Sequence, residues 1–277
     1  MKNIEASDKV LAGPGKKFTI LFPTRERPKL LKNLLDSLVT NTNNLNDIEV
    51  LTAIDIDDKT DYEMLGSYSF VQHFRVHQSL NFSENYYNYL AAHSTGEWII
   101  TGNDDCQFET KNWDWIAWNA LKERPRVIYG WIEDNLGKYR ARGQGDYCCF
   151  PLFGRRGYEA LGYIFPSRIP TWGCDIWASN LYKQINSRIV LPIKIHHYCY
   201  HNMTRAQDHL NKRIGQNQVN YTTRPIRQEI EALMNALNRP EQEVVAMVNT
   251  PEQTAHKGWN PAHSFVNPRK RRLTLSA

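Results

Sequence analysis

Strand and helix patterns alternate along residues 17–105, and this alternation constrains the fold more than any other feature of the sequence. Runs rich in β-branched and aromatic residues, which are typical of strands, are KFTILF, IEVLTAI, FVQHFRVH and EWIIT. Two helical patterns lie among them. One begins near Pro28 and places Leu30, Leu31, Leu34, Leu35 and Leu38 on one face; the other begins at Ser83, which can cap it. This order predicts an α/β domain with a mainly parallel sheet.

The patterns after residue 105 extend the sheet and add a helical end. Helices are predicted for NWDWIAWNALKE, with an apolar face, and for GCDIWASNLYKQI, with Asp175 in its first turn. Strands are predicted for RVIYGWI and YCCFPLF, with antiparallel pairing, and for RIVLPIKIHHYCY. From about residue 205 the chain turns polar and helical, with helix starts at Pro225 and Pro240. We therefore expect a flexible lead-in over 1–16, a main domain over 17–203 and a helical extension with a basic tail over 204–277.

Composition narrows the environment of the protein. No apolar stretch approaches the roughly 18 to 20 residues of a membrane span, so no transmembrane segment is predicted, and the N-terminal residues lack the apolar centre of a signal peptide. The five cysteines form no CxxC pair, which indicates reduced thiols and a cytoplasmic protein, in the host cytoplasm if the source is viral.

The charge balance is basic. A net charge of +5 and a pI near 8.9 are compatible with an anionic partner. Four basic residues are concentrated near the C-terminus, in NPRKRRLTLSA. This stretch is either a solvated tail or an arm that contacts phosphates or lipid headgroups, and the sequence favours neither interpretation.

Polar clusters follow three of the predicted strands, namely PTRER, DIDDKTD and GNDD. The carboxyl ends of parallel strands meet at one edge of a sheet, so we expect these clusters to line a ligand crevice. Asp104 and Asp105 offer the hard oxygen ligands that Mg²⁺ and Mn²⁺ prefer, and Arg25 and Arg27 suit phosphate. Turns and helix caps are the alternative explanation for each cluster.

The sequence contains no GxGxxG after the first strand and no GxxxxGK[ST], which argues against dinucleotide dehydrogenases and P-loop enzymes.

The ordered set TILFPTRERP, IEVLTAIDIDD, NYYNYLAAHSTGEWIITGNDD, YEALGYIFP, WGCDIW and IKIHHY resembles family 2-type glycosyltransferases of the GT-A fold, over roughly residues 17–203. The resemblance implies a Rossmann-type sheet that binds a nucleotide diphosphate sugar, such as a UDP-sugar, against its first strands. The first donor loop then contains Pro23, Thr24, Arg25 and Arg27. The carboxylate that contacts the nucleoside is Asp55 or Asp57, and Asn85 matches a donor-side position.

The same resemblance implies a metal site and a catalytic base. Asn103, Asp104 and Asp105 match the DxD position, but the first Asp is Asn here, which leaves the principal ligand undecided between Asp104 and Asp105. We assign Asp104 to the donor and Asp105 to a Mn²⁺ or Mg²⁺ ion, which is completed by His197 or its neighbour His196. Asp175 matches the general base of inverting members, although the usual ED pair is CD in this chain.

A zinc site is the competing interpretation of His196, His197, Cys199 and His201. Zinc does bind His and Cys, but no pair among these residues has the familiar spacing, and Cys199 falls on a predicted strand. One metal-facing histidine among core residues therefore fits this stretch better.

The acceptor is the part of the function that the sequence defines least. Trp172 and Tyr163 flank the expected acceptor side, as do Trp131 and Asp134; stacking on a sugar or base and simple packing are both open. Lipid-linked, cell-envelope saccharide, protein and nucleic-acid acceptors remain. The basic balance favours a hydroxymethylated base in DNA, a task that resembles that of DNA-glycosylating bacteriophage enzymes. A metal-dependent nuclease and a non-catalytic nucleotide-binding module are the alternatives from other classes.

Overall fold

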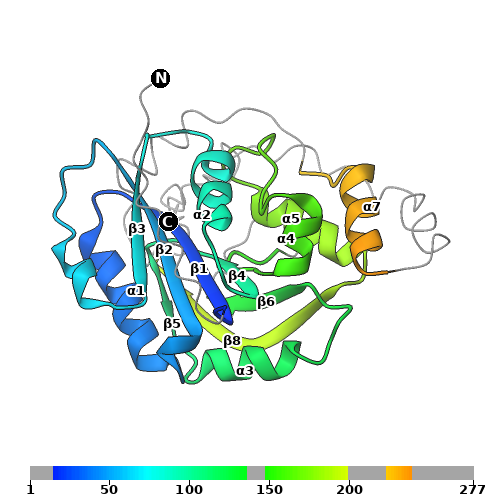
Figure 1. The fold of residues 1–277 in the computed structure, drawn as a ribbon, viewed down its shortest axis with the longest axis horizontal. Coiled ribbons are helices and arrows are strands. Elements are labelled where there is room, and N and C mark those ends of the chain that lie inside the picture. Colours follow the sequence, from blue (N-terminus) through cyan, green and yellow to red (C-terminus); the bar gives the residue numbers. More distant parts are fainter. Residues whose placement is uncertain (1–14, 136–146, 199–222, 239–277) are drawn as a thin grey trace, which may run out of the picture.

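The computed structural model describes residues 15–135, 147–198 and 223–238, and within these ranges one eight-stranded sheet organises the chain (Figure 1). The strand order is β3-β2-β1-β4-β7-β6-β8-β5. The strands are β1 (Phe18–Thr24), β2 (Ile48–Asp55), β3 (Val71–Val76), β4 (Trp98–Thr101), β5 (Cys106–Phe108), β6 (Tyr129–Asp134), β7 (Leu152–Gly154) and β8 (Arg188–His197).

The sheet has a parallel half and a mixed half. Parallel pairing joins β1 to β2 and β4, and β2 to β3, as the alternation of strands and helices predicts. β7 runs antiparallel to both β4 and β6, β6 is parallel to β8, and β5 is antiparallel to β8. The predicted α/β class with a mostly parallel sheet is therefore confirmed. The predicted strand YCCFPLF is shorter than expected, because only its last residues join β7 and Pro151 has no N–H for a ladder.

Helices cover both faces of the sheet (Figure 1). One face packs against α1 (Pro28–Asn41) and α3 (Trp113–Leu121), the other against α2 (Tyr89–Ala92), α4 (Arg155–Leu161), α5 (Cys174–Gln184) and α7 (Arg227–Ala236). Four of the five leucines predicted on one face of α1 are fully buried, and Leu30 is only half-buried. Burying each leucine contributes about 1.5–3 kcal/mol, so this face fixes α1 to the sheet. The 3₁₀ helices η1 (Leu45–Asp47) and η2 (Glu63–Ser67) flank β2.

The segment before α2 is a π-helix, η3 (Ser83–Asn88), and it corrects the prediction that Ser83 caps the helix. Phe82 already has helical backbone angles, so Ser83 lies inside the helical run. The Ser83 hydroxyl instead donates to the carbonyl of Ile169 and lies 3.0 Å from the sulfur of Cys174. The wider π turn changes the direction of the side chains that follow it.

α7 packs into the same core as α5, although it belongs to the stretch assigned to the extension. Ile230, Leu233 and Met234 of α7 are buried in one cluster with Trp177 of α5. α7 begins two residues after Pro225, as predicted, whereas Pro240 and the basic tail lie outside the described residues. The division of the chain at residue 203 stays a prediction. None of the described helices has the length and apolar character needed to cross a bilayer.

Candidate functional site

Asp104 connects the turn after β4 to the loop after β1. Its carboxylate accepts a hydrogen bond from Thr24 Oγ1 at 2.9 Å and forms an ion pair with Arg27 Nη1 at 3.0 Å. The side chain is almost completely buried. Burial raises the pKa of Asp104 to about 6, even though the Arg27 charge acts in the opposite direction. Three residues that were predicted separately, Thr24, Arg27 and Asp104, thus meet at the carboxyl ends of β1 and β4.

Asp105 meets His197, with 3.3 Å between Asp105 Oδ1 and His197 Nε2. Strand pairing produces this contact, because β5 places Cys106 opposite His197 at the end of β8. The backbone N–H of Tyr198 donates to the Asp105 carbonyl at 2.7 Å, and the His197 N–H donates to Asn135 Oδ1 at 2.8 Å. His196 is directed elsewhere, with its Nδ1 3.2 Å from Glu109 Oε1. Of the two candidate histidines, His197 is therefore the one against the carboxylate.

The Asp105–His197 pair can supply two ligands to a divalent ion. A carboxylate oxygen and an imidazole nitrogen both bind Mn²⁺, and Mg²⁺ commonly takes one or two carboxylates and completes its shell with water and substrate phosphates. Among the described residues, no group of three or more His, Cys, Asp or Glu side chains could hold a metal by itself. The donor set fits an ion that is shared with a phosphate-bearing substrate. Cys199 and His201, which the zinc interpretation requires, lie outside the described residues.

Arg25 lies in a carboxylate clamp beside this centre. Its Nη1 is 3.0 Å from Asp55 Oδ2 and 2.6 Å from Asp57 Oδ1, and Tyr86 OH donates to Asp55 Oδ1 at 2.6 Å. The hydrogen bond with Asp57 is the largest cause that raises the pKa of Arg25, so this guanidinium stays charged. The structure brings Arg25, Asp55 and Asp57 together at the ends of β1 and β2, and Pro23 lies on β1 opposite Ala53 of β2.

Asp58 shapes the loop that contains Arg25 and Arg27. Its buried carboxylate accepts from the backbone N–H of Glu26 at 2.9 Å, from the N–H of Thr60 at 2.9 Å and from the hydroxyl of Tyr62 at 2.8 Å. Glu26 has a φ of 55°, which is unusual for a residue with a side chain, and its bond to Asp58 helps to hold this conformation. Burial acts to raise the pKa of Asp58, but these hydrogen bonds outweigh it and leave the pKa below its ordinary value.

Tyr86 and Tyr87 are site residues that the sequence analysis did not single out. Tyr87 OH donates to the Gly102 carbonyl at 2.9 Å and lies 3.2 Å from Asn103 Oδ1, in the turn that contains Asp104 and Asp105. The predicted donor residue Asn85 is exposed, and its amide donates to Ser79 Oγ at 2.8 Å. The adjacent tyrosines in NYYNY were the available signal, but their direction depends on the π turn of η3.

The predicted base Asp175 and the predicted acceptor-side residues Trp172 and Asp134 lie at the start of α5 and at the end of β6. Trp172 and Asp175 are half-buried at the start of α5, which follows Gly173 with a φ of 95°, and Asp175 Oδ1 accepts from the N–H of Ile176 at 2.8 Å. Asp134 is half-buried at the end of β6, opposite Ile195 and therefore near His197. Tyr87 lies near both the start of α5 and the Asp104–Asp105 turn. Burial raises the pKa of Tyr87, and Cys174 of α5 raises it further together with Asp104 and Asp105.

Two other aromatic residues considered for the acceptor side have packing partners. Tyr163 OH donates to Glu229 Oε1 of α7 at 2.8 Å, and the guanidinium of Arg188 lies 5.4 Å from the ring centre of the buried Trp131. Of the cysteines among the described residues, Cys106, Cys148 and Cys174 are buried and Cys149 is half-buried.

Comparisons with known proteins bear on the family and the fold of this chain. The sequence profile described as "Glycosyl transferase family 2" matches residues 19–212, more than two thirds of the chain. S. aureus TarS 1–349 in complex with UDP superposes with a TM-score of 0.55 at 13% identity, covering 84% of this chain and 69% of that one. The mannosyltransferase PcManGT from Pyrobaculum calidifontis, in complex with GDP-Man and Mn²⁺, gives a TM-score of 0.52 at 14% identity over 87% and 73% of the two chains.

At these identities the structural similarities establish the fold, which confirms the predicted GT-A-like architecture. No curated protein matches the sequence significantly. The family match covers the strands, the three loops of charged residues after β1, β2 and β4, and the start of α5. The chain therefore belongs to glycosyl transferase family 2.

Proposed function

We propose that this protein transfers a sugar from a nucleoside diphosphate sugar, a UDP-sugar in the first instance, to a hydroxyl group of an acceptor. The observation that supports this most is the meeting of the Asp105–His197 pair with Asp104 and Arg27 at the carboxyl ends of the parallel strands. Structures of the same fold were solved with UDP, with UDP-GlcNAc and with GDP-Man. A crevice at this edge of an open α/β sheet is also where such folds bind nucleotides.

The donor would contact residues of the first two strand ends and of η3. Asp55 and Asp57 would accept hydrogen bonds from the nucleoside, and Arg25, which contacts both carboxylates, would add positive charge near the phosphates. The further donor contacts that we propose are Pro23, Thr24, Arg27, Asn85 and Asp104. Arg27 would help to stabilise the negative charge that develops on the departing diphosphate.

Asp105 and His197 would hold a Mn²⁺ or Mg²⁺ ion. Once bound, such an ion supplies Lewis-acid stabilisation of the diphosphate leaving group. The proximity of the two side chains supports this assignment, and one protein of the same fold was solved with Mn²⁺.

Asp175 would act as the general base. It would take the proton of the acceptor hydroxyl while that oxygen bonds to the anomeric carbon, and the bonding pair to the diphosphate oxygen would leave with the nucleotide. Attack from the face opposite the leaving group inverts the anomeric centre. Cys174 stands where the family usually has Glu, and we do not assign it the role of base. Burial raises the pKa of its thiol, and the sulfur contacts the carbonyls of Ile169 and Thr171.

For the acceptor we propose a hydroxymethylated base in DNA, with Trp172 and Asp134 on the acceptor side. The net charge of +5 and the basic cluster in residues 269–272 support a polyanionic partner. A cell-envelope saccharide, a lipid-linked sugar or a protein is the alternative within the same reaction class.

The base assignment is tested with Asp175→Asn, which keeps the shape of the side chain and removes its basicity. Calorimetry with UDP-GlcNAc and Mn²⁺ should give a Kd within twofold of the wild type, while turnover falls by at least about 100-fold. Glu159→Gln, an exposed carboxylate on α4, is the matched control and should be silent. Full turnover in the Asp175→Asn variant would show that Asp175 is not the base.

The acceptor is tested by mass spectrometry of nucleosides from hydroxymethylated DNA incubated with the enzyme and a panel of nucleotide sugars. A nucleoside heavier by one sugar residue is the expected product. Nucleotide-sugar turnover without a modified nucleoside would contradict the DNA acceptor and favour a saccharide or protein. DNA cleavage without nucleotide-sugar turnover would indicate a nuclease instead.

A further inference from the structure

Glu229 of α7 is a buried carboxylate at some distance along the chain from every site residue named above. Its side chain is 2% exposed. It accepts hydrogen bonds from Arg168 Nη1 at 2.6 Å and Nη2 at 3.1 Å, Tyr163 OH at 2.8 Å, Trp177 Nε1 at 2.9 Å and the backbone N–H of Ile226 at 2.9 Å.

The buried carboxylate of Glu229 needs these hydrogen-bond donors to remain charged. A buried carboxylate is costly unless it is paired and its oxygens are hydrogen-bonded. Here the fork of Arg168 spans both oxygens, and the neutral donors of Tyr163 and Trp177 complete the shell. Breaking one partner of such a network leaves the others unsatisfied, so the network holds its members in one arrangement.

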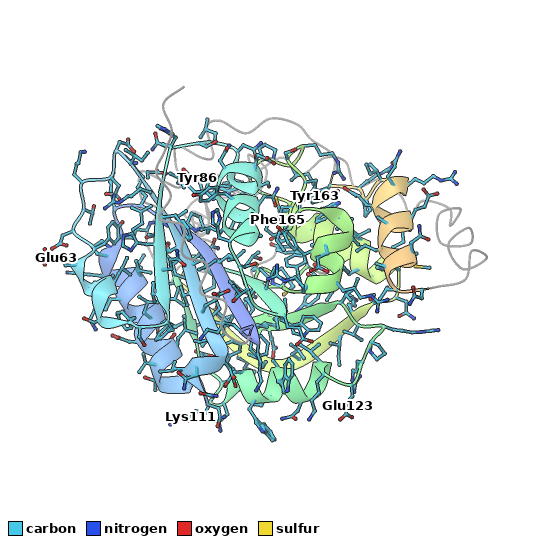
Figure 2. All side chains as sticks on the ribbon, viewed as in Figure 1. Glu63, Tyr86, Lys111, Glu123, Tyr163 and Phe165 are labelled. Carbon is cyan, nitrogen blue, oxygen red and sulfur yellow. The ribbon has the colours of Figure 1, made fainter. Side chains whose placement is uncertain are left out.

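The side chains that donate hydrogen bonds to Glu229 come from the segments that contain the proposed acceptor-side residues. Trp177 lies two residues after Asp175 on α5, and Arg168 lies in the segment that leads to Trp172. Tyr163 begins that segment, and Figure 2 shows Tyr163 and Phe165 in the helical layer next to α5, on the same side of the sheet as Tyr86. One carboxylate on α7 therefore contacts both sides of the turn at Gly173.

The same segment also contacts the first residue of η3 and the two residues before it. The backbone N–H of Phe82 donates to the Pro170 carbonyl at 2.6 Å, Asn81 Nδ2 donates to the Ser167 carbonyl at 3.2 Å, and the Ser83 hydroxyl donates to the Ile169 carbonyl. η3 also contains Tyr86 and Tyr87, which contact the donor side. The segment 167–170 thus lies between a donor-side element and α7.

We propose that Glu229 is a positioning residue of the transferase: through Trp177 and Arg168 it fixes the start of α5, and with it Asp175 and Trp172, relative to the donor site. The role given to Asp175 rests on the proposed function, whereas the coupling of α7 to residues 167–178 rests on the contacts alone. In this account α7 is part of the acceptor-side machinery and not only a cover on the core.

Glu229→Gln tests the proposal in the full-length protein, because it keeps the size of the side chain and removes its charge. Glu231→Gln, a half-buried carboxylate on α7 that pairs with Arg227, is the control. We expect amide hydrogen exchange in residues 167–178 to rise at least fivefold in Glu229→Gln and to be unchanged in Glu231→Gln. In Mn²⁺, the KM for UDP-GlcNAc hydrolysis should stay within twofold while kcat falls about tenfold.

Two results would overturn the proposal. One is faster exchange in Glu229→Gln confined to residues 223–238; the other is an equal loss of UDP binding and of turnover. If Glu229→Gln does not fold, Tyr163→Phe removes one donor without changing the ring and should raise exchange in 167–178 about threefold; unchanged exchange there would also overturn it. Absence of hydrolysis by the wild type would count against the proposed function, while the exchange data would still decide the coupling.

Discussion

Asp105 Oδ1 lies 3.3 Å from His197 Nε2, and a strand of only three residues is what brings them together. β5 leaves the turn after β4 and pairs with the end of β8, which places Cys106 opposite His197. The backbone N–H of Tyr198 also donates a hydrogen bond to the carbonyl of Asp105. The local geometry of the candidate metal site therefore depends on backbone pairing, and substitutions that change only the charge of Asp105 should leave it folded.

We expect Asp105→Asn to lower metal-dependent turnover by at least about 100-fold, because the charge stabilisation that a bound ion supplies is worth several kcal/mol. The melting temperature should change little, because the side-chain shape is kept. Initial rates of UDP release from UDP-GlcNAc at varied Mn²⁺ check this. Glu123→Gln, an exposed carboxylate after α3, is the control. A Mn²⁺ dependence that is identical in Asp105→Asn and the wild type would contradict the metal assignment.

Tyr86→Phe should weaken donor binding without affecting the metal pair. The variant removes the hydroxyl that donates to Asp55, so fewer hydrogen bonds orient the carboxylate that we propose contacts the nucleoside. A hydrogen bond to a charged group contributes about 1.5–3 kcal/mol. Because Arg25 still contacts Asp55 in the variant, we expect only about a fivefold rise in the Kd for UDP, which calorimetry measures. Tyr68→Phe, which removes a similar bond to Asp36 on α1, should leave the Kd unchanged.

Asp58→Asn should lower stability in a pH-dependent way. The folded pKa of Asp58 lies below the ordinary value of 3.8, so its contribution is fully present above that value and is lost as the pH falls through the folded pKa. At pH 7 the free energy of unfolding should fall by about 1–3 kcal/mol, since a charged acceptor of three hydrogen bonds is removed.

Urea unfolding of both proteins at pH 7, 5 and 3.5 measures this difference. The gap between wild type and Asp58→Asn should be constant from pH 7 to 5 and narrower at pH 3.5. Asp61→Asn, an exposed carboxylate of the same loop, should show a small gap at every pH. A gap that widens as the pH falls would refute the assigned role of Asp58.

Much of the fold was predictable because its signals are local. The apolar runs and the leucine face of α1 required no knowledge of distant residues, and the clusters after β1, β2 and β4 meet as parallel pairing requires. Tyr87 and Glu229 were not predictable in the same way. The direction of Tyr87 depends on a π turn, and Glu229 acts through Arg168 and Trp177, which are distant in sequence.

The pairing of the site residues was less predictable than their position. Arg25 and Arg27 were expected to meet phosphate, and the structure shows each of them with a carboxylate partner from a different strand end. Glu26, between the two arginines, has a positive φ, a conformation that the sequence PTRER does not indicate.

Removal of residues 268–277 tests the polyanion hypothesis separately from the chemistry. If the basic cluster binds phosphates, the slope of log binding constant against log salt for DNA should fall by up to about 4, because each basic residue of the cluster would neutralise about one phosphate. Hydrolysis of UDP-GlcNAc should be unaffected. An unchanged salt slope would show that the cluster takes no part in DNA binding.

We propose that the Asp105–His197 pair and Asp175 carry out sugar transfer from a nucleoside diphosphate sugar. The most direct measurement is release of the nucleoside diphosphate from a panel including UDP-GlcNAc and GDP-mannose, with Mn²⁺ or EDTA, for the wild type, Asp105→Asn and Asp175→Asn. The proposed mechanism requires release with at least one donor, loss of that release in EDTA and in both variants, and retained UDP binding in Asp175→Asn. Release that is equal in all three proteins and insensitive to EDTA would contradict it.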